Sequence, residues 1–212
     1  PILTKYREKI SILPLGIFSQ PKVSELRKPV DVFNLVYVGR IEKKKGIFLL
    51  VELMRKIKKP DIRLHIIGEG PYLQRLRRRI SELNLDERII VYGRIKRERL
   101  LNILTQSHVF LLLSAYESRS YALMEAISWG LVPIVTDVGG NRYVVDETYG
   151  YLVSYPPNLD TIKSIIMKLY YNRDYFNQKS RECIRRAVRK FNVKRMIRML
   201  EEMYIDAMNK AF

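Results

Sequence analysis

The hydrophobic positions of this chain change their spacing repeatedly along the sequence. Short apolar runs rich in Val and Ile alternate with longer stretches in which apolar residues recur every three to four positions. Such runs are typical of strands buried on both faces, and such stretches are typical of amphipathic helices. Strands are predicted at residues 34–39, 62–67, 88–92, 109–113 and 132–136. Helices are predicted at residues 46–58, 72–83, 97–105, 121–129, 159–170, 175–190 and 193–211.

The alternation of strands and helices predicts the α/β class. Strands joined through a helix are parallel, because the helix carries the chain back to the end of the sheet at which the previous strand began. We therefore expect a single Rossmann-like domain whose parallel sheet is covered by helices on both faces, with further helices at the C-terminus. Residues 9–14 are expected to form an additional strand. The last helix carries an apolar stripe that we expect to pack on its own domain. The stripe consists of Val193, Met196, Ile197, Leu200, Met203, Tyr204 and Ala207.

Composition supports a folded chain without resident metal or cofactor. The 212 residues are 47% hydrophobic and 29% charged, which favours a packed core over disorder. The longest apolar runs are far shorter than the roughly 20 residues needed to span a bilayer, so we expect a cytoplasmic chain. Cys183 is the single cysteine, and His65 and His108 are too far apart in sequence for a ligand motif. Both histidines, like Cys183 and Trp129, are interpreted as packing residues, and no metal or cofactor is expected.

Positive charge is the unusual property of the composition. The chain has 39 Lys and Arg against 22 Asp and Glu, a formal net charge of +17. A field of that sign attracts phosphates, nucleic acid or anionic lipid without distinguishing among them. Many of the basic residues fall on predicted helix surfaces, where a solvated face explains them equally well.

The loop after the first predicted strand combines two cations with a helix start. Ligands of an open parallel sheet bind beyond the carboxyl ends of its strands, where this loop lies. Arg40 and Lys45 precede a helix that begins near Gly46. A guanidinium, an ammonium and a helix N-terminus can all point at one anion. A lysine-rich surface turn is the alternative interpretation.

A second loop places two glutamates around a helix start. Glu117 and Glu125 are separated by seven residues, too far along one helix to form an acid-base pair. We expect the helix to begin near Ser120, which leaves Glu117 in the loop and Glu125 inside the helix. The free amides of Ser120, Tyr121 and Ala122 would then form an anion-binding cradle between two acids that can accept hydrogen bonds from diols. The alternative is that Glu117 caps the helix and Glu125 is a surface residue. It is disfavoured because the sequence neighbours of Glu125 are apolar.

A third loop, at residues 136–141, contains the pair Gly139-Gly140. Paired glycines allow a backbone to approach a ligand closely, although a tight turn explains them as well.

These motifs together resemble the C-terminal domain of retaining glycosyltransferases of family four, which have the two-domain GT-B fold. The resemblance covers about residues 9–155, and its most specific element is the Glu117 to Glu125 spacing with the Gly-x-x-Pro strand that begins at Gly130. The supporting motifs are Gly39-Arg40 with Lys45-Gly46, Ile67-Gly68-Glu69-Gly70-Pro71, Val91-Tyr92-Gly93 and Asp137-Val138-Gly139-Gly140.

The resemblance implies a nucleotide-diphosphate-sugar donor and a role for each matching residue. Arg40 and Lys45 would hold the diphosphate, Glu117 the hydroxyls of the donor sugar, and Glu125 the ribose diol. Arg40, Lys45 and Glu117 are the expected catalytic residues. The expected substrate-binding set is Gly39, Arg40, Lys45, Arg94, Ile95, Glu117, Arg119, Ser120, Tyr121, Ala122 and Glu125, with Arg94 and Ile95 near the base.

Two positions depart from the family pattern. Ser118-Arg119-Ser120 stands where a small-aromatic-glycine string is usual, and Tyr143 stands where a glutamate commonly follows the paired glycines. Arg119 changes which sugar fits, so the resemblance indicates the class of donor and leaves the sugar open.

The resemblance also implies a partner domain. Family members pair this domain with an N-terminal Rossmann-like domain that supplies the acceptor site, and we expect this chain to lack it and to be inactive alone. Residues 1–30 are interpreted as the end of a linker and a first strand, and residues 31–190 as the donor-binding domain. Residues 191–212 are interpreted as a helix that returns toward the missing half.

The expected function is therefore the donor-binding half of a retaining hexosyltransferase acting on a glycan or lipid-linked acceptor. No Asp-x-Asp occurs in the sequence, so we expect Arg40 and Lys45 to replace a metal at the diphosphate. The alternative is a basic module that binds nucleic acid or an anionic membrane surface without transferase activity. Its support is the net charge and the arginine-rich helix at residues 72–83, but no nucleic-acid motif accompanies them. Peripheral contact with an anionic membrane is compatible with both functions.

Overall fold

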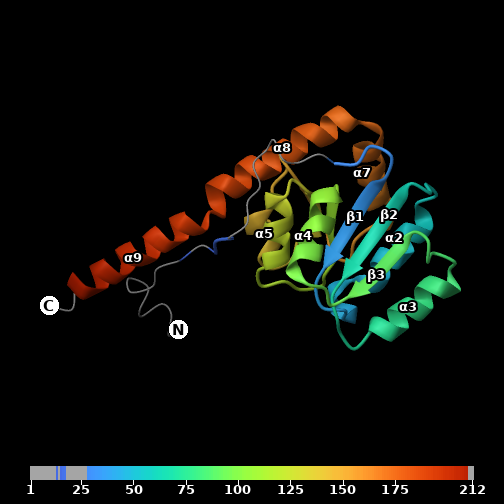
Figure 1. Ribbon diagram of the computed structural model, residues 1–212, viewed down its shortest axis with the longest axis horizontal. Coiled ribbons are helices and arrows are strands. Elements are labelled where there is room, and N and C mark those ends of the chain that lie inside the picture. Colours follow the sequence, from blue (N-terminus) through green and yellow to red (C-terminus); the bar gives the residue numbers. More distant parts are fainter. Residues whose placement is uncertain (1–12, 14, 18–27, 210–212) are drawn as a thin grey trace.

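The computed structural model describes residue 13, residues 15–17 and residues 28–209. This part of the chain contains a six-stranded parallel sheet in the order β3-β2-β1-β4-β5-β6, shown in Figure 1. The strands are β1 (Phe33–Val38), β2 (Ile62–Ile67), β3 (Ile89–Gly93), β4 (Val109–Leu112), β5 (Val132–Thr136) and β6 (Tyr151–Val153). The strand expected at residues 9–14 lies outside the described residues except for Leu13, which is not in a strand.

Helices follow the strands as the alternating pattern predicted. They are the 3-10 helix η3 (Lys43–Lys45) and the α-helices α2 (Ile47–Lys56), α3 (Leu73–Glu82), α4 (Arg97–Gln106), α5 (Tyr121–Ser128), α6 (Asn141–Val144), α7 (Leu159–Tyr171), α8 (Arg173–Lys190) and α9 (Val193–Asn209). Helix α2 packs against α3 and α7, whereas α5 packs against α8. Every residue of β4 and of β5 is buried, which is why both read as continuous apolar runs. The α/β class and the covered parallel sheet are confirmed.

The order of the strands creates a switch point between β1 and β4. From β1 the chain moves outward to β2 and β3, and it then crosses back to place β4 on the other side of β1. The loops that follow β1 and β4 therefore leave neighbouring strands in divergent directions. In doubly wound sheets a crevice for ligands opens at this position.

Helix α9 does not pack as the sequence analysis expected. It continues beyond α8 and projects away from the sheet, as Figure 1 shows. None of the residues of α9 is buried, and two residues of the expected stripe, Ile197 and Tyr204, are 42% and 64% exposed. Outside the stripe, Ile205 and Met208 are 59% and 62% exposed. The prediction that the apolar stripe packs on its own domain is wrong, because α8 already covers α5 and the chain leaves the domain after Phe191.

Within the described residues, no helix combines the length and the apolar character that crossing a bilayer requires.

Candidate active site

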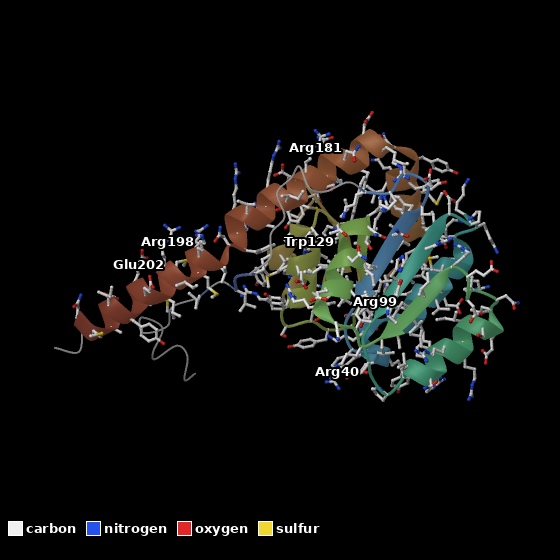
Figure 2. All side chains as sticks on the ribbon, in the orientation of Figure 1. Arg40, Arg99, Trp129, Arg181, Arg198 and Glu202 are labelled. Atoms are coloured by element: carbon white, nitrogen blue, oxygen red, sulfur yellow. The ribbon has the colours of Figure 1, made fainter. Side chains whose placement is uncertain are left out.

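The loop after β1 is held in place by its backbone and by a buried tyrosine. The Tyr37 hydroxyl donates a hydrogen bond to the carbonyl oxygen of Arg40 at 2.7 Å. Burial, reinforced by the charges of Glu117 and Glu42, raises the pKa of Tyr37, so its hydroxyl stays a donor. The Arg40 side chain is 74% exposed, and its Nη2 lies 2.7 Å from Oε1 of Glu42. A cation is thus presented to solvent on a fixed loop, and Figure 2 shows it at the end of the sheet toward which the strand arrows point.

Glycine joins this loop to the end of β4. Gly46 precedes α2 with φ +72°, and a Cβ built there would lie 2.1 Å from the carbonyl oxygen of Leu113. The amide of Ala115 donates to the carbonyl oxygen of Lys44 at 2.8 Å. The loops after β1 and β4 are therefore in direct backbone contact.

The loop after β4 turns into α5 at the expected residue. The Ser120 hydroxyl accepts a hydrogen bond from the amide of Leu123 at 3.2 Å, which caps the helix that begins at Tyr121. Tyr121 is exposed and Ala122 half-buried, so the first turn of α5 is accessible from outside.

Glu117 is buried where the two loops meet. Its Oε1 accepts hydrogen bonds from Lys45 Nζ and from Ser114 Oγ, each at 2.8 Å. A carboxylate removed from water requires such partners. The structure thus brings Lys45 and Glu117 together from segments that the sequence analysis had selected separately, whereas Ser114 was missed because a serine at a strand end carries no distinctive pattern.

The paired glycines of the third loop allow contact between backbones. Gly139 has φ +52°, and a Cβ there would lie 1.7 Å from the carbonyl oxygen of Glu117. The amide of Gly140 donates to that same oxygen at 2.9 Å. The loop after β5 therefore supports the loop that carries Glu117, and the close approach is to protein.

Glu125 is buried inside α5 and pairs with an arginine from another helix. Its Oε1 lies 2.7 Å from Nη2 of Arg97, the first residue of α4. The sequence analysis expected Glu125 in an apolar environment but missed Arg97. The position of Arg97 in the sequence could have indicated this pair. Arg97 begins the helix that follows β3, so it lies beyond the carboxyl ends of the strands, as the start of α5 does.

A cleft of about 590 Å³ opens over the carboxyl ends of β1, β2 and β3. It is lined by Gly39, Arg40, Arg94 and Ile95 together with the glycine loop after β2. Arg94 Nε lies 3.5 Å from Oε2 of Glu69 in that loop. Gly68 must be glycine, since its φ is +141° and a Cβ would lie 1.8 Å from the carbonyl oxygen of Gly39. Four of the predicted substrate-binding residues thus share one cleft.

Other predicted contacts are not formed. Arg40 and Lys45 belong to different ion pairs, with Glu42 and Glu117 respectively, so they do not converge on one point in this structure. Arg119 is exposed and lines a separate hollow of about 230 Å³. The bend at Ser118 separates the buried Glu117 from Arg119.

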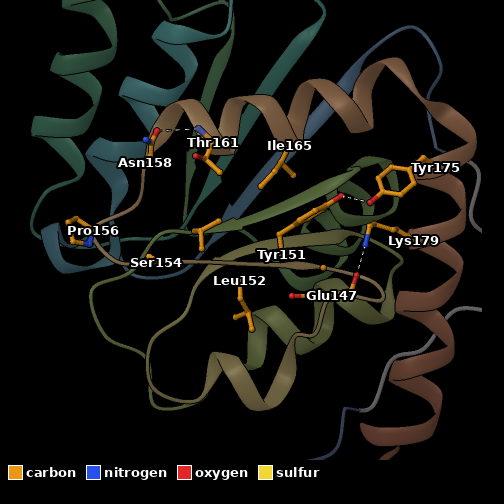
Figure 3. A pocket seen from close by; sticks show the side chains of 12 residues that line it. Glu147, Tyr151, Leu152, Ser154, Pro156, Asn158, Thr161, Ile165, Tyr175 and Lys179 are labelled. Atoms are coloured by element: carbon orange, nitrogen blue, oxygen red, sulfur yellow. Dashed lines mark hydrogen bonds between the residues drawn. The ribbon is translucent and has the colours of Figure 1, made fainter.

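A third cavity, of about 560 Å³, lies between β6, α7 and α8 and contains none of the predicted site residues (Figure 3). The Tyr151 and Tyr175 hydroxyls are 2.9 Å apart there. Lys179 Nζ donates to the carbonyl oxygen of Glu147 at 2.7 Å and lies 4.8 Å from the centre of the Tyr151 ring. Its cation already has partners, so we assign no ligand to this cavity.

Comparison with protein families decides the membership of this chain. The model of the family described as glycosyl transferases group 1 matches residues 19–191. The chain belongs to this family. Among relatives of this group 1 chain, UDP-Gal:alpha-D-GlcNAc-diphosphoundecaprenol alpha-1,3-galactosyltransferase of Escherichia coli is 29% identical over 93% of the chain and 54% of its own length. A subunit of the phosphatidylinositol N-acetylglucosaminyltransferase of Arabidopsis thaliana is 30% identical over 68% of the chain and 32% of its own length.

Solved structures share the fold of the group 1 chain. Sucrose-phosphate synthase from Thermosynechococcus elongatus superimposes with a TM-score of 0.83 at 24% identity, over 98% of this chain and 56% of its own. HepE of Anabaena, solved in complex with UDP and glucose, has a TM-score of 0.76 at 17% identity, over 83% of this chain and 49% of its own. These neighbours are GT-B glycosyltransferases. The chain thus spans about half of these proteins and of the Escherichia coli relative.

Proposed function

We propose that this chain is the donor-binding half of a retaining, metal-independent glycosyltransferase. It would bind a nucleotide-diphosphate-sugar, whose hexosyl group goes to a glycan or lipid-linked acceptor. The observation that carries the proposal is the 2.8 Å ion pair between Lys45 and Glu117. This pair joins the two loops at the switch point of the sheet and places a cation beside a buried carboxylate. The cation can bind a diphosphate and the carboxylate can accept hydrogen bonds from sugar hydroxyls, so the two charges together suit a sugar attached to a diphosphate.

The remaining residues are assigned by their position around that pair. Arg40 and Lys45 serve the diphosphate, Glu117 the sugar hydroxyls and Glu125 the ribose, and Arg94 and Ile95 line the cleft that would receive the base. Negative charge accumulates on the diphosphate as the glycosidic bond breaks. The cations Arg40 and Lys45 and the amides of α5 stabilise that charge, and one such contact is typically worth about 3 kcal/mol.

Metal independence rests on the sequence and retention on the family resemblance. The chain has no Asp-x-Asp to bridge a divalent cation to the diphosphate, so the two cations take that role. The acceptor class draws on the Escherichia coli relative, whose name specifies a diphosphoundecaprenol-linked acceptor.

The test is a thermal-shift panel of UDP, GDP and ADP with EDTA present. At a ligand concentration 100-fold above Kd, one nucleotide is expected to raise Tm by roughly 5–10 °C. Arg40→Ala should remove most of that shift without unfolding the chain, because the side chain is 74% exposed. Arg77→Ala, which removes an exposed arginine of α3, is the matched control and should keep the shift.

Two results would overturn the proposal. One is the absence of a shift with all three nucleotides, and the other is a shift that appears only when Mg²⁺ replaces EDTA. Binding to DNA with a steep salt dependence, together with no response to nucleotides, would support the basic-module alternative.

A further inference from the structure

The hollow of about 230 Å³ that contains Arg119 lies between the start of α5, the short helix α6 and the junction of α8 with α9. Three cations line it, Arg119 from the loop after β4, Lys190 at the end of α8 and Arg195 in the first turns of α9. Among its described lining residues there is no acid. A concave surface that collects three positive charges without a carboxylate is suited to an anion.

The cations of this hollow are available to a ligand. Arg195 Nη1 donates to the carbonyl oxygen of Arg189 at 3.0 Å, which orients the guanidinium, and its remaining donors have no partner among the residues that the structure describes. Within the part of the chain that the structure describes, Arg119 and Lys190 form no ion pair, and both side chains are exposed. Buried Met124 and Phe191 form the apolar floor.

Both departures from the family pattern lie in this hollow. Arg119 replaces the usual aromatic residue and Tyr143 replaces the usual glutamate, and the structure places them in one lining. The two changes have the same electrostatic sense, since one adds a positive charge and the other removes a negative one. Tyr143 is also 75% exposed, so its ring can cover a ligand without any core rearrangement.

The hollow is connected to the proposed donor-sugar position through one short loop. Arg119 follows Glu117 by two residues, and Gly140, three residues before Tyr143, donates its amide to the carbonyl oxygen of Glu117. A ligand in the hollow therefore lies on the loops that support the carboxylate assigned to the sugar.

We propose that this hollow binds a compact phosphate or diphosphate group. The inference goes beyond the proposed function, because it assigns a second anion site next to the loop that carries Glu117. Arginine and lysine bind phosphate oxygens through several donors, and Tyr143 contributes a hydroxyl. The concave shape and small volume favour one compact anionic group over the flat array of headgroups at a membrane surface.

The probe for this site is inorganic pyrophosphate, titrated by calorimetry into the chain saturated with UDP. The double variant Lys190→Gln/Arg195→Gln should weaken pyrophosphate binding at least tenfold. The control Arg77→Gln/Arg78→Gln removes the same charge from the exposed face of α3 and should change binding less than twofold. Tyr143→Glu, which introduces an acid into the hollow, should also weaken binding at least tenfold, and the neutral Tyr143→Gln less than threefold.

Titration of UDP itself separates the two proposals. Lys190→Gln/Arg195→Gln should bind UDP like the unsubstituted chain, which also verifies folding. If the unsubstituted chain binds none of UDP, GDP and ADP, the proposed function fails, and the pyrophosphate series without nucleotide still tests the hollow. Pyrophosphate binding that is insensitive to Lys190→Gln/Arg195→Gln and to Tyr143→Glu would overturn the inference.

A lipid source of the phosphate is distinguished with vesicles. Vesicles of equal parts phosphatidylglycerol and phosphatidylcholine are compared with phosphatidylcholine alone, using the same double variants. Equal loss of vesicle binding in both double variants, together with pyrophosphate binding that Lys190→Gln/Arg195→Gln alone weakens, would support the phosphate site. Selective loss in Lys190→Gln/Arg195→Gln, without pyrophosphate binding, would overturn the inference in favour of a membrane contact.

Discussion

At the scale of single residues, the two histidines form part of a polar chain across the sheet. His65 Nδ1 lies 2.8 Å from the Tyr92 hydroxyl, and its Nε2 lies 3.2 Å from Asn34 Oδ1. The amide of Asn34 donates to His108 Nδ1 at 3.1 Å, which leaves His108 Nε2 to donate to the carbonyl oxygen of Pro29. The interpretation of both histidines as packing residues is confirmed. Burial lowers the pKa of His65 to about 4 and that of His108 to about 3.

These two pKa values predict how stability depends on pH. Between pH 6.5 and pH 4 the unfolded chain binds protons at both histidines while the folded chain does not, so the free energy of unfolding falls as the pH falls through this window. Urea denaturation at pH 7, 6, 5 and 4.5 measures the slope. His65→Gln should make the slope clearly shallower, and an unchanged slope would contradict the assignment.

The buried Glu125 carries a prediction about the ribose. A carboxylate that accepts hydrogen bonds from a ribose diol distinguishes a ribonucleotide from its deoxy analogue, because losing a hydrogen bond to a charged group costs about 1.5–3 kcal/mol. We expect the nucleoside diphosphate that binds this chain to bind at least tenfold more tightly than its 2′-deoxy form. Glu125→Gln should reduce this preference to less than threefold, as measured by calorimetry. A preference that survives the substitution would assign the ribose to another residue.

At the scale of elements, the three loops after β1, β4 and β5 act as one layer. Backbone contacts connect them at Gly46 and Gly139, where a side chain would meet a carbonyl oxygen at 2.1 Å and 1.7 Å. The sequence analysis located all three loops, because strand ends, cations and glycines mark them. It did not indicate that they contact each other, since that depends on the strand order.

Gly139 therefore allows a matched test of the layer. Gly139→Ala should destabilise the chain by roughly 1–3 kcal/mol and weaken nucleotide binding, because the methyl group displaces the loop that carries Glu117. Gly93→Ala is the control, because Gly93 has a similar φ of +71° but no atom within 4 Å of a new Cβ. It should show only the cost of the left-handed conformation, about 1–2 kcal/mol, and normal binding. Equal effects of both variants on binding would contradict a role for the contact.

Element bounds agree with the sequence analysis to within about two residues wherever apolar periodicity and Gly or Pro signals coincide. Strand β2 and strand β5 match fully, and α5 begins directly after its serine cap. Short elements such as β6 and α6 were not predicted. Three or four residues carry no recognisable period, and β6 forms only because β5 offers it an edge.

At the scale of the whole molecule, long-range relations were the least predictable part. Arg97 meets Glu125 because α4 and α5 converge at one edge, and no local pattern encodes that pairing. The apolar stripe of α9 was recognised, but a stripe specifies which side of a helix is apolar and not what covers it. Figure 2 shows Arg198 and Glu202 on the projecting part of this helix, far from the sheet.

The exposure of α9 predicts tolerance to charged substitutions there. Ile205→Glu/Met208→Glu should change Tm by no more than about 2 °C, because exposed positions contribute within about 0.5 kcal/mol each. Ile184→Glu, which places the same charge at a buried position of α8, should abolish the cooperative thermal transition. A loss of many degrees in the α9 variant would show that the helix folds back onto the domain.

The two cations next to the switch point differ in how much freedom they retain. Lys45 is fixed by a buried carboxylate before any anion arrives, whereas the Arg40 side chain is largely in solvent. Immobilising a long cationic side chain costs up to about 2 kcal/mol of rotamer entropy, and the more exposed Arg40 faces more of that cost than Lys45 does. Neutralising Glu117 would remove a competitor for Lys45 but would also release the ammonium into many rotamers. The rigidity of this corner of the protein is therefore itself a determinant of how tightly an anion is held.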